Sequence, residues 1–290
     1  MAEGEQKQAQ PSWIQNIKLL DRHLLVKAGM HHLPTIPKVS RMDNESFVLY
    51  KYRAINKWLI ESLINQTLYF ATPDKLNDPF DCRIDLQKAI ERAVISATGD
   101  RRDSLSSFLT NPEFFKNWRA TFDKMGVCSF SKKTVEETLM ETLMWAHYAD
   151  DHRGVRLKYQ FRAASLMGDM ATAQEIVTSQ DVEYLDDSLV PWLVGNAPMD
   201  MTEFAKELAK RYLRTKSPAW AYEQEARIIR QKSGPFKLKD VFLAEVCFGL
   251  RTAQDDRDLV IKLAQSYCHD VKFSQMERGE TEFRFAKKAT

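Results

Sequence analysis

The chain has 290 residues, of which 44% are hydrophobic, so it can bury a substantial core. Lysine and arginine total 42 against 40 acidic residues. This near balance excludes the strong overall positive field of sequence-independent nucleic-acid binding, although a local basic groove stays open. The four cysteines contain no CxxC pair, which argues against a zinc knuckle or a secreted disulfide framework. Because no apolar run is long enough to cross a bilayer and the first residues lack a signal-peptide core, we expect a cytoplasmic protein without a membrane partner.

The hydrophobic pattern predicts an N-terminal extension and linker over residues 1–45, followed by a single domain over residues 46–290. The extension begins with a polar stretch that offers little apolar surface. It then shows helical spacing over residues 13–27.

Short runs of β-branched and aromatic residues predict strands, and apolar residues at helical spacing predict helices. The strands are residues 47–53, 67–72, 127–131, 155–159, 176–185 and 243–248, with a terminal hairpin of 271–274 and 282–286. The helices are residues 55–63, 86–97, 105–125, 135–150, 202–214 and 253–268, with a loop at 98–103, a point of interruption at Pro112 and a capping box of Thr134 and Glu137. No regular strand–helix–strand rhythm is present. The expected fold class is therefore α+β, with a mixed, mainly antiparallel sheet and flanking helices.

The first polar cluster lies on the strand predicted at residues 47–53. Strand alternation puts Lys51 and Arg53 on one face and Tyr50 and Tyr52 on the other. An arginine at the end of a strand can grip a phosphate through its planar guanidinium fork. The alternative is a solvated strand edge with stacked tyrosines.

The second polar cluster is the loop over residues 77–81. Asn77, Asp78 and Asp81 surround a proline, and this arrangement could orient a ligand or hold a cation. Such side chains also commonly bond to their own backbone, so fixing the loop is the alternative role.

The third cluster is His147, which falls in the apolar stripe of the helix predicted at residues 135–150. A histidine in that stripe would be partly desolvated and most often satisfied within the core. The nearby Asp150, Asp151 and His152 keep an acid–base or metal role open.

The fourth cluster lies at residues 220–227. If this segment is extended, Glu223, Glu225 and Arg227 project from one face. If it is helical, Glu223 and Arg227 instead form an ordinary ion pair one turn apart.

Taken together in chain order, a set of short motifs resembles the mostly bacterial family called domain of unknown function twenty-nine seventy-one. The motifs are residues 49–53 (LYKYR), 68–70 (LYF), 76–81 (LNDPFD), 128–131 (CSFS), 144–150 (MWAHYAD), 152–154 (HRG), 220–227 (WAYEQEAR) and 245–249 (EVCFG). The combination spans most of residues 47–287 and is specific, whereas each piece alone is not. This resemblance implies no particular reaction.

A second similarity is to the Arg-Ser-Glu group of ADP-ribosyltransferases. Arg53 on a first strand, Ser129 and Ser131 on a middle strand, and then Glu223 and Glu225 occupy the places of that group's motifs. The resemblance implies an ADP-ribosyltransferase-like fold with NAD as substrate. In that group the arginine holds the NAD phosphates and the serine strand supports the nicotinamide pocket. The final glutamate steadies the ribosyl cation and the attacking nucleophile, which a preorganised carboxylate can do.

The candidate site therefore has Glu225, Glu223 and His147 as its catalytic residues and no assigned metal ligand. Its candidate NAD-binding residues are the polar members of the four clusters and of the serine strand. They are Arg53, Tyr52, Ser129, Ser131, Asn77, Asp78, Asp81, Tyr222 and Arg227.

Three functions are compatible with these clusters. The first is an NAD-consuming ADP-ribosyltransferase or NAD glycohydrolase, whose partners would be a nucleotide and an unidentified protein or nucleic-acid target. The second is a non-catalytic sensor that binds a ligand or a protein. The third is a metal-assisted hydrolase or nuclease that uses Asp78, Asp81, His147, Asp150 and Glu223.

Overall fold

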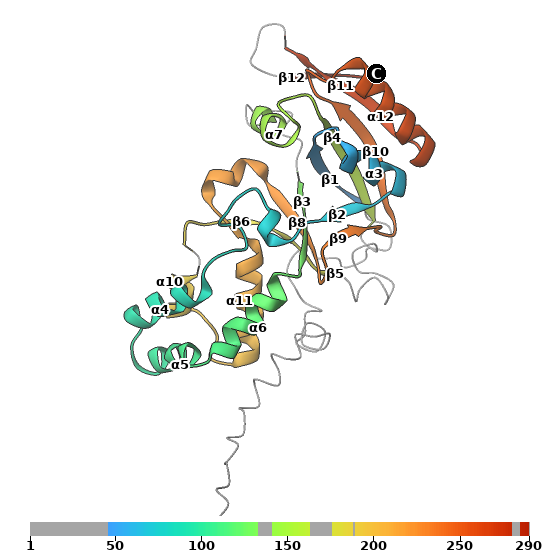
Figure 1. Cartoon of the computed structure of the whole chain (residues 1–290). Helices are drawn as coiled ribbons and strands as arrows, with labels where there is room; N and C mark the ends of the chain where they lie inside the picture. The colour runs from blue at the N-terminus through green and yellow to red at the C-terminus, as the bar shows by residue number, and fades with distance from the viewer. Residues whose placement is uncertain (1–45, 133–140, 163–175, 188, 280–284, 290) are drawn as a thin grey trace, which may run out of the picture. The chain divides into compact units, whose positions relative to one another are not determined.

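The computed structural model describes residues 46–132, 141–162, 176–187, 189–279 and 285–289 (Figure 1). The chain divides into two compact units, and we describe each separately. The helical unit comprises Leu76–Lys124 and Leu185–Thr215, and the sheet unit comprises the other described residues. The single domain expected over residues 46–290 stays a prediction.

An eight-stranded sheet forms the centre of the sheet unit. Its strand order is β12 (Phe285–Ala289), β11 (Lys272–Arg278), β10 (Val241–Phe248), β4 (Val155–Arg162), β1 (Ser46–Arg53), β3 (Gly126–Ser131), β8 (Glu225–Arg230) and β5 (Ile176–Asp181). β10 and β11 are parallel, and every other neighbouring pair is antiparallel. The predicted α+β class with a mixed, mainly antiparallel sheet is confirmed.

Shorter elements complete the sheet unit. β2 (Leu68–Phe70) pairs with β9 (Gly234–Phe236), and β6 (Glu183–Tyr184) has two residues. β7 (Thr215–Lys216) also has two, of which Thr215 is the last residue of the helical unit and Lys216 belongs to the sheet unit. Two 3-10 helices, η2 (Pro73–Lys75) and η3 (Pro218–Glu223), lie before residue 76 and before β8. The strand expected at residues 176–185 is therefore divided into β5 and β6.

Helices cover both faces of the large sheet (Figure 1). On one face, α3 (Lys57–Asn65) and α12 (Gln254–Tyr267) pack on the main apolar cluster. On the other face, α7 (Glu141–Tyr148) packs through Met144 and Trp145 on Tyr52 and Cys247. The alternation along β4 shows the difference, because Val155 and Leu157 join the main cluster whereas Arg156 between them faces α7. One face of the sheet is thus apolar, and the face under α7 carries charged residues.

The helical unit contains α4 (Leu86–Ser96), α5 (Gly99–Leu109), α6 (Pro112–Phe122), α10 (Val190–Gly195) and α11 (Met201–Arg214). Side-chain caps begin α4, α6 and α11, since Asp85 accepts from Lys88 N at 3.1 Å, Asn111 from Phe114 N at 3.2 Å and Asp200 from Glu203 N at 3.0 Å. Aromatic rings in mutual contact form much of its core. They are Phe108, Phe114, Trp118, Phe122, Trp192, Phe204 and Tyr212.

Local sequence signals predicted some helix boundaries correctly and others wrongly. The interruption at Pro112 is confirmed, because this proline occupies the first turn of α6. The loop predicted at residues 98–103 is wrong, since Thr98 is the N-cap of α5. The helix expected at residues 13–27 and the capping box of Thr134 and Glu137 lie outside the described residues. Within the described part of the chain, no helix combines the length and apolar content needed to cross a membrane.

The turn that follows α7 has an unusual backbone. Asp150, Asp151 and His152 have φ values of 49°, 50° and 67°. The left-handed region costs a non-glycine residue roughly 1–2 kcal/mol, so three in succession need support from their surroundings. Part of that support is local, because Gly154 N donates to Ala149 O at 2.7 Å.

Two glycines allow this turn to approach its neighbours. A Cβ at Gly154 would lie 2.2 Å from Arg53 O, and a Cβ at Gly249 would lie 2.2 Å from His152 O. The two glycines also contact each other, since Gly249 N donates to Gly154 O at 3.0 Å. The chain therefore has backbone against backbone at both positions, where only glycine fits.

We expect Gly154→Ala and Gly249→Ala each to lower the free energy of unfolding by about 1–3 kcal/mol, because the added methyl group must displace backbone. Gly195→Ala is the matched control, since nothing lies within 4 Å of its Cβ position. Urea unfolding followed by circular dichroism measures all three. Equal stability of Gly154→Ala and Gly195→Ala would contradict the close packing.

Candidate functional site

The three strands that carry the predicted motifs are neighbours in the sheet. β3 lies between β1 and β8. Ser131 is opposite Tyr50 of β1 on one side and opposite Glu225 of β8 on the other. Ser129 is likewise opposite Arg227. Directly opposed residues share a face, so these serines, Glu225 and Arg227 all lie on the face covered by α7.

Arg53 lies on the other face of the sheet. It alternates with Tyr52 along β1, and its partner on β4 is Val155, a member of the main apolar cluster. The sequence pattern brings the motif strands together, but it does not bring the arginine to the face that holds Glu225.

A buried network of four charges is the main feature of the α7 face. Lys216 Nζ donates to Glu223 Oε2 at 2.6 Å and to Glu225 Oε2 at 3.1 Å. Arg227 holds the same Glu225 carboxylate through Nε at 2.7 Å and Nη2 at 3.1 Å. All four side chains are at most 5% exposed. The two positive and two negative charges balance, as buried charges must.

Local backbone geometry explains why both glutamates reach one ammonium group. η3 ends at Glu223, and Gln224 has φ of 45° in the left-handed region. β8 then starts at Glu225, whose backbone N–H donates to Tyr184 OH at 2.8 Å. The segment is therefore a 3-10 turn joined to a strand, so the helical alternative, with Glu223 and Arg227 paired one turn apart, does not occur. Glu225 and Arg227 pair along a strand instead.

The two carboxyl groups have opposite pKa shifts. Burial raises the pKa of Glu223 above its ordinary value, although Lys216 and the Tyr148 hydroxyl oppose the shift. Burial also acts on Glu225, but Arg227 and Lys216 outweigh it and lower the Glu225 pKa to about 2. A pair of carboxyl groups with separated pKa values is typical of acid–base sites.

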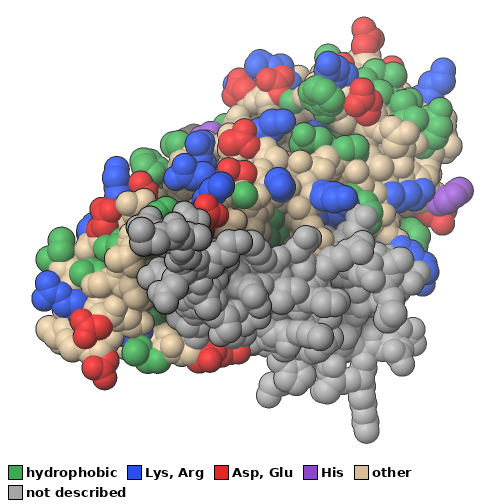
Figure 2. Space-filling model, turned by 60° about the horizontal axis from the view of Figure 1, so that its bottom comes forward, with side chains coloured by type: hydrophobic (Ala, Val, Ile, Leu, Met, Phe, Trp, Pro, Cys, Tyr) green, Lys and Arg blue, Asp and Glu red, His purple; other side chains and the backbone are tan. Residues whose placement is uncertain are grey.

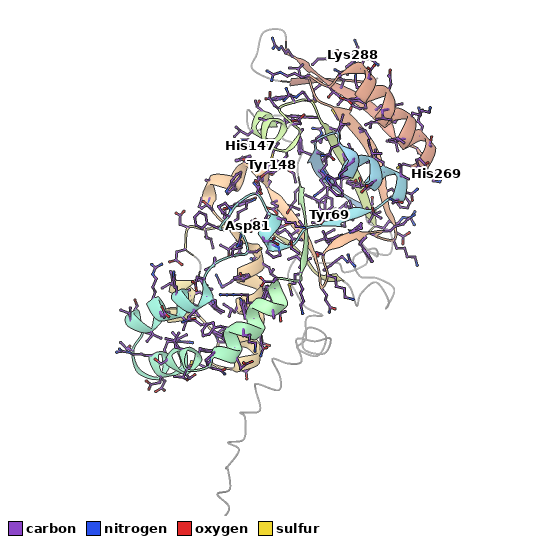
Figure 3. All side chains as sticks on the ribbon, in the orientation of Figure 1. Tyr69, Asp81, His147, Tyr148, His269 and Lys288 are labelled. Carbon is purple, nitrogen blue, oxygen red and sulfur yellow. The ribbon has the colours of Figure 1, made fainter. Side chains whose placement is uncertain are left out.

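Aromatic side chains lie between this network and solvent. Tyr148, at the end of α7, donates from its hydroxyl to Glu223 Oε1, and burial and the Glu223 charge both raise the Tyr148 pKa. His147 Nδ1 is 2.8 Å from Tyr222 OH, and the Trp220 ring is 6.2 Å from the His147 ring. Figure 3 labels His147 and Tyr148 side by side on α7. The partly exposed rings of Tyr148, Tyr222 and Trp220 thus lie between solvent and the buried carboxyl group of Glu223.

The prediction of His147 within an apolar stripe is wrong. The buried residues of α7 are Glu141, Met144 and Trp145, which leaves Leu143 and His147 on the outward side. The error comes from Glu141, a charged residue that the apolar pattern does not select but that is 2% exposed. His147 is exposed and bonded to Tyr222, so it is accessible to a ligand.

Glu141 belongs to a second buried ion pair on the same face. Arg156 Nη1 donates to Glu141 Oε1 at 2.8 Å, and Trp145 Nε1 donates to the same oxygen at 2.9 Å. Tyr52 OH is 3.5 Å from that oxygen, and the Tyr52 ring is 5.2 Å from the Trp145 ring, edge to face. Tyr52 therefore contacts the pair that fixes α7 on the sheet.

The loop over residues 77–81 lies in the helical unit. Asp78 Oδ1 accepts from Phe80 N at 2.9 Å, and Asp81 N donates to Asp78 O at 3.1 Å, which is the loop-fixing arrangement. Both aspartates are buried, and Cys82 Sγ lies 3.5 Å from Asp81 Oδ1. No group of three or more His, Cys, Asp or Glu in the described ranges is arranged to hold a metal ion.

Sequence reasoning missed Lys216, Tyr148 and Glu141. Lys216 precedes Ser217 and Pro218 without any local pattern, so its role is visible only in three dimensions. Tyr148 follows His147 in the motif of residues 144–150 that carries the family resemblance, and this position was the one sequence signal that could have identified it. No disulfide links the four cysteines, all of which are described.

We expect Glu225→Gln to lower the free energy of unfolding at pH 7 by about 3–5 kcal/mol, because it leaves a buried guanidinium and ammonium under-compensated. A depressed carboxyl pKa stabilises the fold above the unfolded value of 4.5, and this contribution is lost as the pH falls towards about 2. The difference in free energy of unfolding between the parent protein and Glu225→Gln should therefore narrow below pH 4.5. Urea unfolding at several pH values tests this.

The matched control is Glu277→Gln, whose carboxylate is half exposed and pairs with Lys288 at 3.7 Å. A surface pair of this kind contributes about 0–1 kcal/mol, so this variant should follow the parent protein at every pH. A constant difference between parent and Glu225→Gln across the pH range would contradict the depressed pKa.

Part of the chain matches a family of known sequences. Residues 144–228 match the model of a family described as "Protein of unknown function (DUF2971)". No curated protein and no solved structure matches the chain. The matched span runs from α7 to β8 and contains His147, Glu223 and Glu225, whereas Arg53 and Ser129 precede it. The resemblance inferred from the motifs is confirmed, and over residues 144–228 the chain is similar to the DUF2971 family.

Proposed function

We propose that the sheet unit cleaves the N-glycosidic bond of NAD or of a closely related nucleotide, with Glu223 as the reacting carboxyl group. The observation that carries the proposal is the position of Glu223, which joins the buried Lys216 to the Tyr148 hydroxyl below partly exposed rings. The neighbouring serine and glutamate strands, β3 and β8, add support through the similarity to Arg-Ser-Glu transferases, whereas Arg53 of β1 lies on the other face of the sheet.

The reaction needs two carboxylates with different tasks. When the bond between the ribose C1′ and the nicotinamide nitrogen breaks, its electron pair neutralises the pyridinium, so nicotinamide leaves without a proton. The ribose is left as an oxocarbenium cation, which a fixed negative charge stabilises. A water molecule then attacks C1′ and loses a proton to a base.

The opposite pKa shifts support one division of these tasks. Glu225 stays ionised because Arg227 and Lys216 hold its pKa at about 2, so it supplies fixed negative charge. Glu223 has a raised pKa, so it is the stronger base and can take the proton from water. This assignment differs from the one implied by sequence similarity, in which Glu225 was the reacting residue.

The aromatic side chains suit a planar substrate. Trp220 and Tyr222 rings, 6.0 Å apart, stand beside His147 at the solvent side of the network. Aromatic side chains bind nucleotide bases by stacking, which contributes about 1–3 kcal/mol per base. An acceptor other than water, in a protein or a nucleic acid, would turn the same step into ADP-ribosyl transfer.

A non-catalytic sensor is the second candidate function. It is favoured by the charge balance of the network, in which Arg227 grips Glu225 through two nitrogen atoms. In that case the network would fix the fold of a ligand-binding surface. The parent protein would then cleave no NAD, and substitutions in the network would affect only stability or ligand binding.

We expect Glu223→Gln to reduce NAD cleavage at least 100-fold, the usual contribution of a general base. Nicotinamide release from NAD, followed by chromatography, measures the rate. Glu245→Gln is the matched control, because Glu245 is another buried glutamate of the sheet, bonded to Ser274 Oγ at 2.6 Å. Absence of any nicotinamide release by the parent protein, or equal rates in both variants, would refute the proposal in favour of the sensor.

We expect Tyr148→Phe to move the acid limb of the pH–rate profile to higher pH. The hydroxyl donates to Glu223 and opposes the rise of its pKa, so removing the donor raises the pKa of the base further. Because the base acts in its ionised form, the rate of NAD cleavage then increases only at higher pH. Tyr69→Phe, on an exposed tyrosine of β2, should leave the profile unchanged, and a Tyr148→Phe profile that moves to lower pH contradicts the assignment.

A further inference from the structure

Two basic residues of β1 face the apolar side of the sheet. Lys51 is opposite Leu157 and Arg53 is opposite Val155, and both partners on β4 belong to the main apolar cluster. Each basic side chain is partly buried. The aliphatic part of a lysine or arginine side chain on this face is surrounded by apolar residues and not by water. The charge at its end therefore needs a compensating partner.

The ladder between β1 and β3 is short beside these residues. β1 pairs with β4 along its whole length, whereas its ladder with β3 is formed at Tyr50 and Ser131. Beyond that point, Lys51 Nζ donates to the backbone oxygen of Ser129 at 2.7 Å, so the ammonium takes the place of a strand partner. Lys51 Nζ also lies 5.1 Å from the centre of the Phe130 ring. The lysine side chain thus connects the two strands beyond the end of their ladder.

Neither of these two cations of β1 has an acidic partner among the described residues. Within the described part of the chain, no carboxylate forms an ion pair with Lys51 or Arg53, and the hydrogen-bond partners of Lys51 are the uncharged Ser129 O and Cys128. Burial lowers the pKa of Lys51; Cys128 opposes this shift, whereas the positive charge of Arg53 adds to it. Glu225 raises that pKa, but it has the smallest of these effects, and Arg227 and Lys216 already hold this carboxylate.

This arrangement contrasts with the α7 face, where every positive charge of the network has a carboxylate. Two like charges close together and partly desolvated are unfavourable unless an anion joins them. A guanidinium fork and an ammonium group are the usual pair for a phosphate, because one fixes its orientation and the other adds a point charge. Burial raises the pKa of Tyr159 and the nearby charge of Arg53 opposes the rise, so a protonated hydroxyl that can donate a hydrogen bond lies near this arginine.

We propose that Lys51 and Arg53 form a binding site for a phosphate-bearing anion on the α3 and α12 face of the sheet unit. The site is separate from the carboxylates of the α7 face, because strand alternation directs the two sets of side chains to opposite sides. The proposal does not depend on the glycosidic reaction, since it concerns binding of the anion alone.

Inorganic phosphate and pyrophosphate are the probes, added to the full chain at constant ionic strength maintained with chloride. We expect a saturable rise of the melting temperature for the parent protein. Arg53→Gln should lose the rise, and Lys51→Met, which keeps the apolar stem, should weaken the affinity at least 10-fold. Arg162→Gln is the matched control, because Arg162 is an exposed arginine of β4 whose guanidinium lies over the Phe242 ring.

A rise of equal size in all four proteins, or a rise that increases without saturation, would overturn the proposal. A second measurement covers the case in which a variant fails to fold. In the parent protein labelled with ¹⁵N, phosphate should shift one arginine Nε–H signal with the same midpoint as the melting curve. The absence of any shifted arginine signal would also overturn it. The protein could bind phosphate without cleaving NAD, or cleave NAD without binding phosphate. The two assays therefore test the two proposals separately.

Discussion

The shared hydrogen bonds of Lys216 organise the charged face of the sheet unit. One ammonium group joins Glu223, at the end of a 3-10 helix, to Glu225, at the start of a strand. Removing any one member would leave a buried charge unmatched, which is far more costly than losing an ion pair at the surface. The requirement for balance fixes the position of η3 against β8, and it keeps one carboxyl group ionised while the other holds a raised pKa.

A second balanced pair holds the helix above this network. Glu141 accepts from Arg156 and from Trp145, and these bonds fix α7 on the sheet. The helix then ends in a left-handed turn whose close contacts require Gly154 and Gly249. Tyr148 is the last residue of α7, so the same contacts determine where its hydroxyl meets Glu223. Residues that never touch a substrate thus set the geometry of the candidate site.

Strand alternation gives the two faces of the sheet different chemistry. Serine, glutamate and arginine side chains of β3 and β8 meet under α7, where opposite charges are matched. Lys51 and Arg53 turn to the other face, where no carboxylate among the described residues pairs with them. One face therefore suits acid–base chemistry, and the other suits binding of an anion.

The sequence by itself determined the α+β class, most strands and helices, and the motif strands on which the candidate residues lie, because period-two and helical patterns are local properties. It also put Lys51 and Arg53 on one face of their strand. Only the tertiary structure decided which residues become partners. Lys216 shows no local signal, and Glu141 interrupts an apolar pattern, yet both are buried because distant opposite charges compensate them. Such compensation depends on contacts between segments far apart in the chain, which hydrophobic periodicity does not encode.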